Sequence, residues 1–368
     1  MPARFQNPAP SLRQTKPLPM PQTTFARRLI RWQKQHGRHN LPWQTRDPYR
    51  VWLSEIMLQQ TQVATVAEYY PRFTAAFPTV ADLAAAKQDD VLALWQGLGY
   101  YSRARNLHKA ARQVMENFGG RFPDTRLQLE TLCGVGRSTA AAIAAFAFLR
   151  RETILDGNVK RVLCRVFALD GDLADKTFEK QLWTLAESLL PPDNADMPAY
   201  TQGLMDLGAT MCRRSKPQCA SCPMADICQA KQQNRTAELP RKKTAARVET
   251  LPLYWLLVRR TDGALWLEKR AEKGIWGGLY CVPCLESTAA LYAAAADFGI
   301  DDGDLRELPA LTHRLTHRLL LVSLFCARAR RQPENAAGAW VLPQDLADYG
   351  LPKPLAKLLA ERQGTLFG

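Results

Sequence analysis

The chain lacks any uninterrupted apolar run near the roughly 18 to 20 residues that a membrane-spanning helix requires. It also lacks a basic and then apolar leader with a small-residue cleavage site at its start. We therefore expect a cytoplasmic protein with no membrane partner. With 368 residues and 46% hydrophobic content, the chain can bury an ordinary core, and its length favours two or three domains.

Acidic side chains are also scarce relative to basic ones. Lys and Arg number 49 against 35 Asp and Glu, so the net charge is +14. Residues 1–230 hold 29 basic and 20 acidic side chains, whereas residues 251–368 hold 14 and 13. Nucleic acid is the first partner to consider, and the first part of the chain is where phosphates would bind. A basic protein without such a partner would have the same charge, so the charge leaves that alternative open.

Composition divides the chain into four segments. Residues 1–23 have no acidic side chain and are rich in proline, and we expect them to form a disordered tail. Residues 24–230 have helical periodicity, with Phe25, Leu29 and Trp32 on one face of the first helix and helix-length runs at 102–118, 138–149 and 175–189. Residues 231–250 have few large apolar side chains and read as a basic linker.

Residues 251–368 change to the pattern of a smaller α+β domain. Two apolar runs flank Thr261-Asp262-Gly263, which is a hairpin signal. The run LTHRLLLVSLFCARA predicts a further strand, and residues 286–299 and 352–363 predict helices.

Four of the nine cysteines crowd into one short loop, at Cys212, Cys219, Cys222 and Cys228. Four thiolates at this spacing can hold zinc or an iron–sulfur cluster. Structural zinc more often uses two short-spaced pairs, and this loop has one, so the spacing favours iron–sulfur. Arg213, Arg214 and Lys216 lie in the first gap, where they would offset the charge of a cluster or meet a phosphate.

Two further segments contain candidate anion-binding or catalytic residues. Gly134-Val135-Gly136 lies between helical runs and permits a tight turn whose backbone N–H groups face an anion at the start of the next helix. An ordinary helix–helix turn explains this pattern equally well. Glu55 lies in a strongly apolar stretch, and Asp156 opens a helix, where it is a candidate for a plain N-cap as much as for a catalytic group.

Taken in order, these segments resemble the helix-hairpin-helix, iron–sulfur DNA glycosylases, and among them the adenine-removing MutY branch. The resemblance covers about residues 24–230, and residues 251–368 resemble the MutT-like, Nudix-like domain that follows a linker in that branch. It is carried by LPW at 41–43, the Glu55 segment, GLGYYSRARNLHKAA from Gly97, CGVGRSTAA, LDGNVKRVL and the four-cysteine loop.

The resemblance implies an all-α helix-hairpin-helix glycosylase domain with one [4Fe-4S] cluster on the cysteine loop, followed by a smaller α+β domain. It further implies a monomeric enzyme of base excision repair, associated with the nucleoid through DNA. The partner would be double-stranded DNA in which adenine lies opposite 8-oxoguanine or guanine.

The resemblance also assigns roles to residues. Glu55 would protonate adenine at N7, Asp156 would stabilise the oxocarbenium ion, and Asn158 would orient the sugar and water. The apolar neighbours of Glu55 would favour its neutral form by desolvation. In endonuclease III a lysine follows the Gly-Val-Gly-Arg segment and attacks the sugar, whereas Ser138 stands here, so the reaction would be monofunctional hydrolysis. Lys160 lies near Asp156, but we do not assign it a catalytic role.

The same resemblance predicts the residues that contact DNA. The hairpin would bind phosphate, Gln60, Thr61 and Tyr100 would lie beside the lesion, Gln202 would line the adenine pocket, and Thr316 and His317 would read the lesion. The predicted DNA-binding residues are Gln60, Thr61, Tyr100, Gly134, Val135, Gly136, Ser138, Gln202, Thr316 and His317.

Two positions depart from the family pattern. Leu315 replaces the aromatic residue of the usual Phe-Ser-His loop, and Cys133 replaces the usual proline of the hairpin. Three other kinds of protein are alternatives to the adenine glycosylase hypothesis. They are a pyrimidine glycosylase with lyase activity, a non-catalytic iron–sulfur DNA-binding protein and a nucleotide pyrophosphatase. Ser138 opposes the first, and the last requires a metal-binding R-E-x-x-E-E helix, which residues 286–299 lack.

Overall fold

The computed structural model describes residues 22–241, 248–333 and 338–362. The expected tail, except for its last two residues, and the linker residues 242–247 lie outside this part of the chain. Within the described ranges, no helix has the length and apolar character needed to cross a membrane. The chain forms two compact units, one from Met1–Arg38 and Arg151–Lys243 and the other from His39–Arg150 and Thr244–Gly368.

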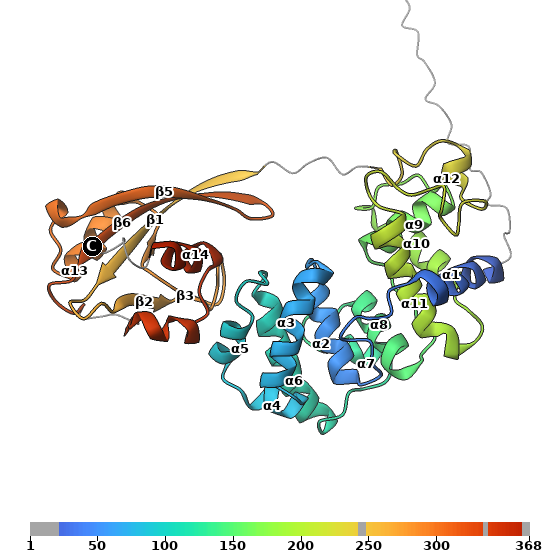
Figure 1. Cartoon of the computed structure of the whole chain (residues 1–368), viewed down its shortest axis with the longest axis horizontal. Coiled ribbons are helices and arrows are strands. Elements are labelled where there is room, and N and C mark those ends of the chain that lie inside the picture. Colours follow the sequence, from blue (N-terminus) through green and yellow to red (C-terminus); the bar gives the residue numbers. More distant parts are fainter. Residues whose placement is uncertain (1–21, 242–247, 334–337, 363–368) are drawn as a thin grey trace, which may run out of the picture. The chain divides into compact units, whose positions relative to one another are not determined.

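The first unit is helical and joins segments far apart in the sequence. Figure 1 shows α1 beside α11, and Phe25, Leu29 and Ile30 of α1 are buried. Gly203 allows the close approach of the two helices, because a Cβ there would lie 2.9 Å from Leu29 Cγ. The helices of this unit are α1 (Gln22–His36), α9 (Gly157–Val166), α10 (Lys176–Ser188), η1 (Asn194–Asp196), α11 (Met197–Asp206), the π-helix η2 (Leu207–Met211) and α12 (Gln229–Gln232).

The helical part of the second unit packs around aromatic side chains. Trp52 and Trp95 are fully buried, and Phe73 lies edge-on to Trp95 with ring centroids 5.9 Å apart. Local sequence sets the helix starts: Asp47 caps α2 with Pro48 in its first turn, and Thr79 and Asp82 form a capping box at α4. The helices are α2 (Pro48–Leu58), α3 (Val63–Ala76), α4 (Val80–Ala85), α5 (Gln88–Leu94), α6 (Ser102–Phe118), α7 (Arg126–Leu129) and α8 (Arg137–Phe148).

The sheet part of this unit is a mixed sheet in the order β3-β2-β1-β6-β5, with β4 paired to β1 and β7 to β2. The central pair, β1 and β6, is parallel, and Gly263 with a φ of +94° turns the chain between the antiparallel β1 and β2. The strands are β1 (Glu249–Arg259), β2 (Leu265–Lys269), β3 (Tyr280–Cys281), β4 (Cys284–Leu285), β5 (Arg306–Arg314), β6 (Arg318–Arg328) and β7 (Gly338–Val341).

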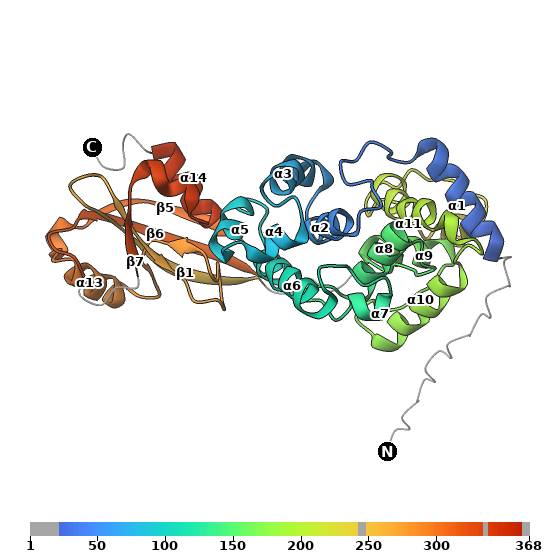
Figure 2. The ribbon, with the colours of Figure 1, turned by 90° about the horizontal axis from the view of Figure 1, so that it is seen from below.

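Helices cover both faces of this sheet, as Figure 2 shows for α13 (Thr288–Asp297) and α14 (Lys353–Arg362). Leu256 and Val258 of β1 pack in one cluster with Leu291 of α13, whereas Trp255 and Leu257 belong to the core that contains Leu355 of α14. Because successive side chains of a strand point to opposite faces, β1 is buried on both. The sheet part of the second unit also contains two short 3₁₀ helices, η3 (Asp302–Asp304) and η4 (Pro343–Asp348).

The fold class expected from the sequence is confirmed: helices from Gln22 to Gln232 are followed by a smaller α+β part. The run expected at 102–118 is α6, and those at 138–149 and 175–189 correspond to α8 and α10. The sequence did not predict β5, nor the division of the helices between two units. Helical periodicity reports which face of each helix is buried, and it contains no information on which helices share a core.

Candidate active site and metal centre

Glu55 lies on α2 at the edge of a buried face. Its predicted apolar neighbours are all buried in the structure, whereas Glu55 itself is half-buried. A carboxyl group in this position is partly removed from water. The buried neighbours are Val51, Trp52, Leu53, Ile56 and Met57.

The chain immediately after α2 adopts an uncommon backbone. Gln60 is exposed and has a φ of +56°, and the half-buried Thr61 accepts a hydrogen bond from Arg103 Nη2 at 2.9 Å. Tyr100 is 45% exposed and has a φ of +49°. Non-glycine residues rarely adopt a positive φ, and such residues concentrate at functional sites. Arg103, which the sequence analysis included in the GLGYYSRARNLHKAA segment without giving it a role, lies between these segments.

The predicted hairpin is a tight turn between α7 and α8. Val135 N–H donates to Leu132 O at 3.1 Å. Gly134 has a φ of +78°, and a Cβ at this position would lie 2.9 Å from Asn106 Cβ. Gly136 is the N-cap of α8 and provides no side-chain cap. The N-terminus of α8 therefore has no side-chain cap from Gly136, and a helix N-terminus is a place where anions bind.

The structure explains one departure from the family pattern in this hairpin. Cys133 N–H donates to Gln113 Oε1 at 2.8 Å, a bond that proline could not make. Ser138 is half-buried in the first turn of α8.

Asp156 is the N-cap of α9, as its place in the sequence allowed. Its Oδ1 accepts hydrogen bonds from the N–H groups of Asn158 and Val159, both at 2.8 Å, and the side chain is otherwise exposed. The N-terminus of a helix stabilises the negative charge of such a carboxylate. One turn later, Lys160 forms an ion pair with Glu179 of α10.

Arg161 connects the start of α9 to the cysteine loop. Its Nη2 donates to Asn158 Oδ1 at 2.9 Å and to Gly208 O at 2.7 Å, and its Nε donates to Cys212 O at 2.8 Å. Burial lowers the pKa of Arg161. Sequence reasoning missed this residue. The spacing of Asn158 and Arg161, one helical turn apart, was the available signal.

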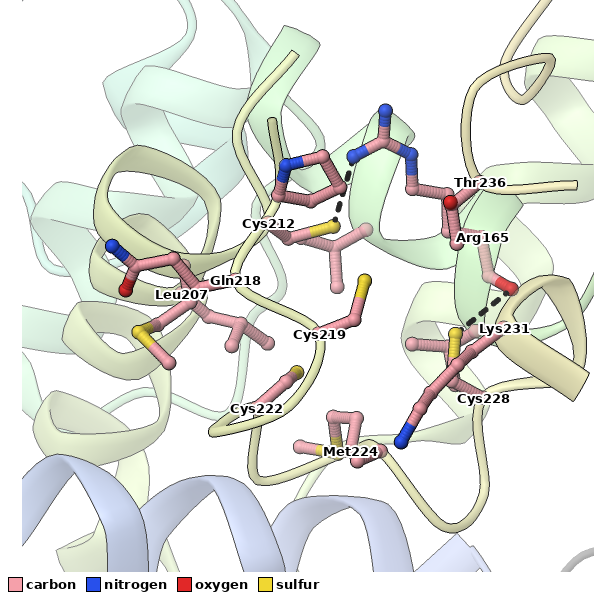
Figure 3. Close-up of a pocket in the computed structure, with 15 residues that line it drawn as sticks. Arg165, Leu207, Cys212, Gln218, Cys219, Cys222, Met224, Cys228, Lys231 and Thr236 are labelled. Carbon is pink, nitrogen blue, oxygen red and sulfur yellow. Dashed lines mark hydrogen bonds between the residues drawn. The ribbon is translucent and has the colours of Figure 1, made fainter. Parts of the chain in front are cut away.

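The four cysteines of the loop line one pocket, and Figure 3 shows Cys212, Cys219, Cys222 and Cys228 around it. The π-helix η2 leads into Cys212, whose N–H donates to Leu207 O at 2.7 Å. Burial raises the pKa of the Cys222 thiol to about 11, so metal binding there would have to displace a proton.

A buried arginine lies against this pocket. Arg165 Nη1 lies 3.4 Å from Cys212 Sγ and donates to Arg213 O at 2.7 Å, and Arg165 Nε donates to Leu239 O at 2.8 Å. It therefore places a positive charge where four thiolates would need one, and the same side chain holds the loop by its backbone.

In the ranges that the structure describes, no group of three or more His, Cys, Asp or Glu is arranged to hold a metal ion. The donor set is four thiols around one pocket beside an arginine, and four thiols can hold zinc or an iron–sulfur cluster.

Gln202 is buried on α11. Its Nε2 donates to Asp206 Oδ1 at 2.8 Å, and Asp206 also accepts from Arg38 Nε at 2.7 Å. The predicted adenine-pocket residue is therefore held by a buried carboxylate, which is also paired with the half-buried Arg38.

The lesion-reading residues predicted from two distant segments lie together in the second unit. Tyr100, Thr316 and His317 line one hollow of about 640 Å³, and Tyr100 Oη lies 2.7 Å from Thr316 Oγ1. Basic and aromatic side chains dominate the rest of the lining, and Leu315 belongs to it. The further side chains include Tyr101, Arg105, Trp276, His313, Arg314, Arg318 and Lys353.

Comparison with known proteins supports the same assignment. Residues 53–188 match the HhH-GPD superfamily of base excision DNA repair proteins, and residues 254–361 match the NUDIX domain. The chain is 35% identical over 350 residues to the adenine DNA glycosylase of Buchnera aphidicola subsp. Acyrthosiphon pisum, covering 93% of this chain and 99% of that protein. The chain belongs to the adenine DNA glycosylase family.

Some other relatives match a shorter stretch of the chain. The human adenine DNA glycosylase is 44% identical over 227 residues, which cover 59% of this chain and 41% of that protein. The structure of a thermostable thymine-DNA glycosylase superposes with a TM-score of 0.53 at 30% identity and covers 58% of this chain and 97% of that chain. This adenine DNA glycosylase is thus a hydrolase of base excision repair built on the helix-hairpin-helix fold.

Proposed function

We propose that this enzyme removes adenine opposite 8-oxoguanine or guanine by acid-assisted hydrolysis of the N-glycosidic bond and leaves an abasic site. The observation that carries the proposal is the placement of Asp156. Two backbone N–H groups and a helix N-terminus hold its carboxyl group at an exposed position. A fixed negative charge is what a developing oxocarbenium ion requires.

Glu55 supplies the complementary group. Adenine is a poor leaving group as an anion, so a proton must reach the base, at N7, while the bond breaks. Glu55 is half-buried on a helix with buried apolar neighbours, and we propose that its carboxyl group delivers this proton. Asn158, whose amide oxygen is held by Arg161, would orient the sugar and the attacking water.

Two features support hydrolysis rather than lyase chemistry. Ser138 offers no amine in the first turn of α8. Lys160, the amine one turn from Asp156, forms an ion pair with Glu179 and is thereby directed away from the role of a nucleophile.

The hollow around Tyr100, Thr316 and His317 supports recognition of 8-oxoguanine opposite the adenine. Its basic side chains would meet phosphate, and its aromatic rings would pack on a base. Thr316 and His317 provide hydrogen-bonding groups despite Leu315. We further propose that the enzyme acts as a monomer on double-stranded DNA.

We also propose that Cys212, Cys219, Cys222 and Cys228 hold one [4Fe-4S] cluster. When bound, the cluster would fix the loop in place and thereby the carbonyl groups that Arg161 and Arg165 hold. Visible absorption and iron analysis of the purified protein test this proposal, and zinc in place of iron would contradict it.

The activity is tested with a duplex containing adenine opposite 8-oxoguanine. Free adenine is measured, and strand breakage is compared before and after treatment with alkali. We expect adenine release, with breakage only after alkali. Breakage without alkali at the rate of base release would overturn hydrolysis, and no adenine release would overturn the proposed activity.

A further inference from the structure

Arg103 of α6 is a buried cation that binds backbone oxygens. It is 7% exposed, and its Nη1 donates to Ile56 O at 2.9 Å and to Met57 O at 2.7 Å. Burial lowers its pKa to about 10, so the guanidinium is still charged at neutral pH. These two carbonyls directly follow Glu55 on α2, so Arg103 fixes the end of the helix that holds the acid candidate.

The other end of the same guanidinium holds two segments predicted to lie beside the lesion. Its Nη2 donates to Thr61 Oγ1 at 2.9 Å and to Gly99 O at 3.1 Å. Each contact is next to a residue with a positive φ, Gln60 in the first segment and Tyr100 in the second. Backbone of this kind persists only where the surroundings hold it, and Arg103 is the side chain that touches both segments.

Tyr100 continues the connection to the sheet part of the same unit. Its ring lies over the Arg103 guanidinium at 5.6 Å, and its hydroxyl lies 2.7 Å from Thr316 Oγ1. A continuous set of contacts therefore runs from Thr316 through Tyr100 and Arg103 to the backbone beside Glu55.

We propose that Arg103 is a positioning residue that couples the hollow containing Thr316 to the helix that bears Glu55, so that the base opposite adenine sets the rate of adenine release. This inference rests on the proposed function. A guanine-type base that occupies the hollow would press on Tyr100, and Arg103 would transmit the change to the end of α2. The two separate NH2 groups of the guanidinium are essential. One ammonium group cannot reach both the oxygens that Nη1 binds at the end of α2 and the oxygens that Nη2 binds at Thr61 and Gly99.

The test measures single-turnover adenine release at saturating enzyme on two duplexes, one with 8-oxoguanine and one with guanine opposite adenine. The readout is the ratio of the two rates, which a loss of folded enzyme does not change. We expect the native ratio to exceed one. Arg103→Lys should lower the rate with 8-oxoguanine about tenfold and bring the ratio close to one. Arg112→Lys, an exposed change on the same helix, is the matched control and should leave the ratio unchanged.

A double-mutant cycle shows whether Tyr100 and Arg103 act together. Tyr100→Phe keeps the ring over the guanidinium and removes the hydroxyl near Thr316, so it should lower the ratio several-fold on its own. In the Arg103→Lys background it should have no further effect, because the connection is already broken. Additive effects of the two changes would overturn the coupling.

The remaining outcomes separate the coupling from the proposed function. A native preference for 8-oxoguanine that Arg103→Lys leaves intact would overturn the coupling alone. Equal native rates on both duplexes would overturn both the coupling and the proposed preference. No adenine release from either duplex would overturn the proposed activity itself.

Discussion

The two units hold their candidate catalytic carboxyl groups by different means. Glu55 is on a helix anchored by an extensive hydrophobic core that includes Trp52 and Trp95. Asp156 is held by the backbone of α9, and α9 in turn binds the cysteine loop through Arg161 and Arg165. The apolar cluster beside that loop is small, with Cys228, Ala230 and Leu239 as its buried members.

This difference indicates that the units respond to different perturbations. Apolar packing holds the acid in place without any cofactor. The position of the charged group depends on a loop whose own apolar packing is limited, so its order should depend on what the four thiols bind. A change of Asp156 itself should therefore lower activity without loss of structure. A change of a cysteine in the loop should lower activity together with the order of the loop.

The largest effect is expected for Asp156→Asn. Asparagine caps a helix about as well as aspartate, so α9 should persist and Tm should change by no more than about 2 °C. Without the negative charge, the single-turnover rate of adenine release should fall at least about 1,000-fold. Circular dichroism and duplex binding serve as controls for folding, and a rate within tenfold of native would show that the charge is dispensable.

Removing a cysteine of the loop tests whether the units depend on the cofactor unequally. Cys219→Ser should lower adenine release about 100-fold and speed hydrogen exchange in residues 212–228 and in α9. Exchange in α2 and α6 should not change. Cys284→Ser, in the other unit, is the matched control and should leave the visible absorption intact. Equal loss of protection in both units would contradict the comparison.

Arg161→Met isolates the link between the loop and the active-site helix. It removes the bonds to Asn158 Oδ1, Gly208 O and Cys212 O while keeping a side chain of similar length. Contacts of this supporting kind change activity by roughly 10- to 100-fold, and we expect a rate about tenfold lower with the visible absorption retained. An unchanged rate would mean that Asn158 is positioned without the arginine.

The smallest effect is expected for the hairpin. Gly134→Ala introduces a Cβ 2.9 Å from Asn106 Cβ at a φ of +78°, which should lower stability by about 1–2 kcal/mol and duplex affinity about tenfold. The rate at saturating enzyme should stay within about threefold of native. For stability, Gly136→Ala is the control, since a Cβ there meets no atom within 4 Å, and an equal loss of Tm in both variants would argue against strain at Gly134.

Local chemistry made most of the fold predictable. The α6 run, the Asp262-Gly263 hairpin and the N-cap at Asp156 were all evident because each depends on a few neighbouring residues. The four thiols were evident because cysteine seldom clusters in one loop without a ligand. The roles given to Glu55, Asp156 and Asn158 came from resemblance, and they are still predictions.

The supporting arginines could not be predicted for a physical reason. Arg103, Arg161 and Arg165 bind backbone carbonyls, and every residue has a carbonyl, so no residue type in the sequence marks their partners. From sequence alone, a basic side chain in a basic protein is predicted to contact a phosphate. Only the folded chain shows that these three are buried or half-buried and face the protein itself.

The most direct test of the central claim is the rate of adenine release by Glu55→Gln on a duplex with adenine opposite 8-oxoguanine. Glutamine keeps the shape of the side chain but cannot donate the proton that the leaving base needs. We predict a single-turnover rate at least about 1,000-fold below native, with Tm, visible absorption and duplex affinity unchanged. A rate within tenfold of native in a folded, DNA-binding variant would contradict it.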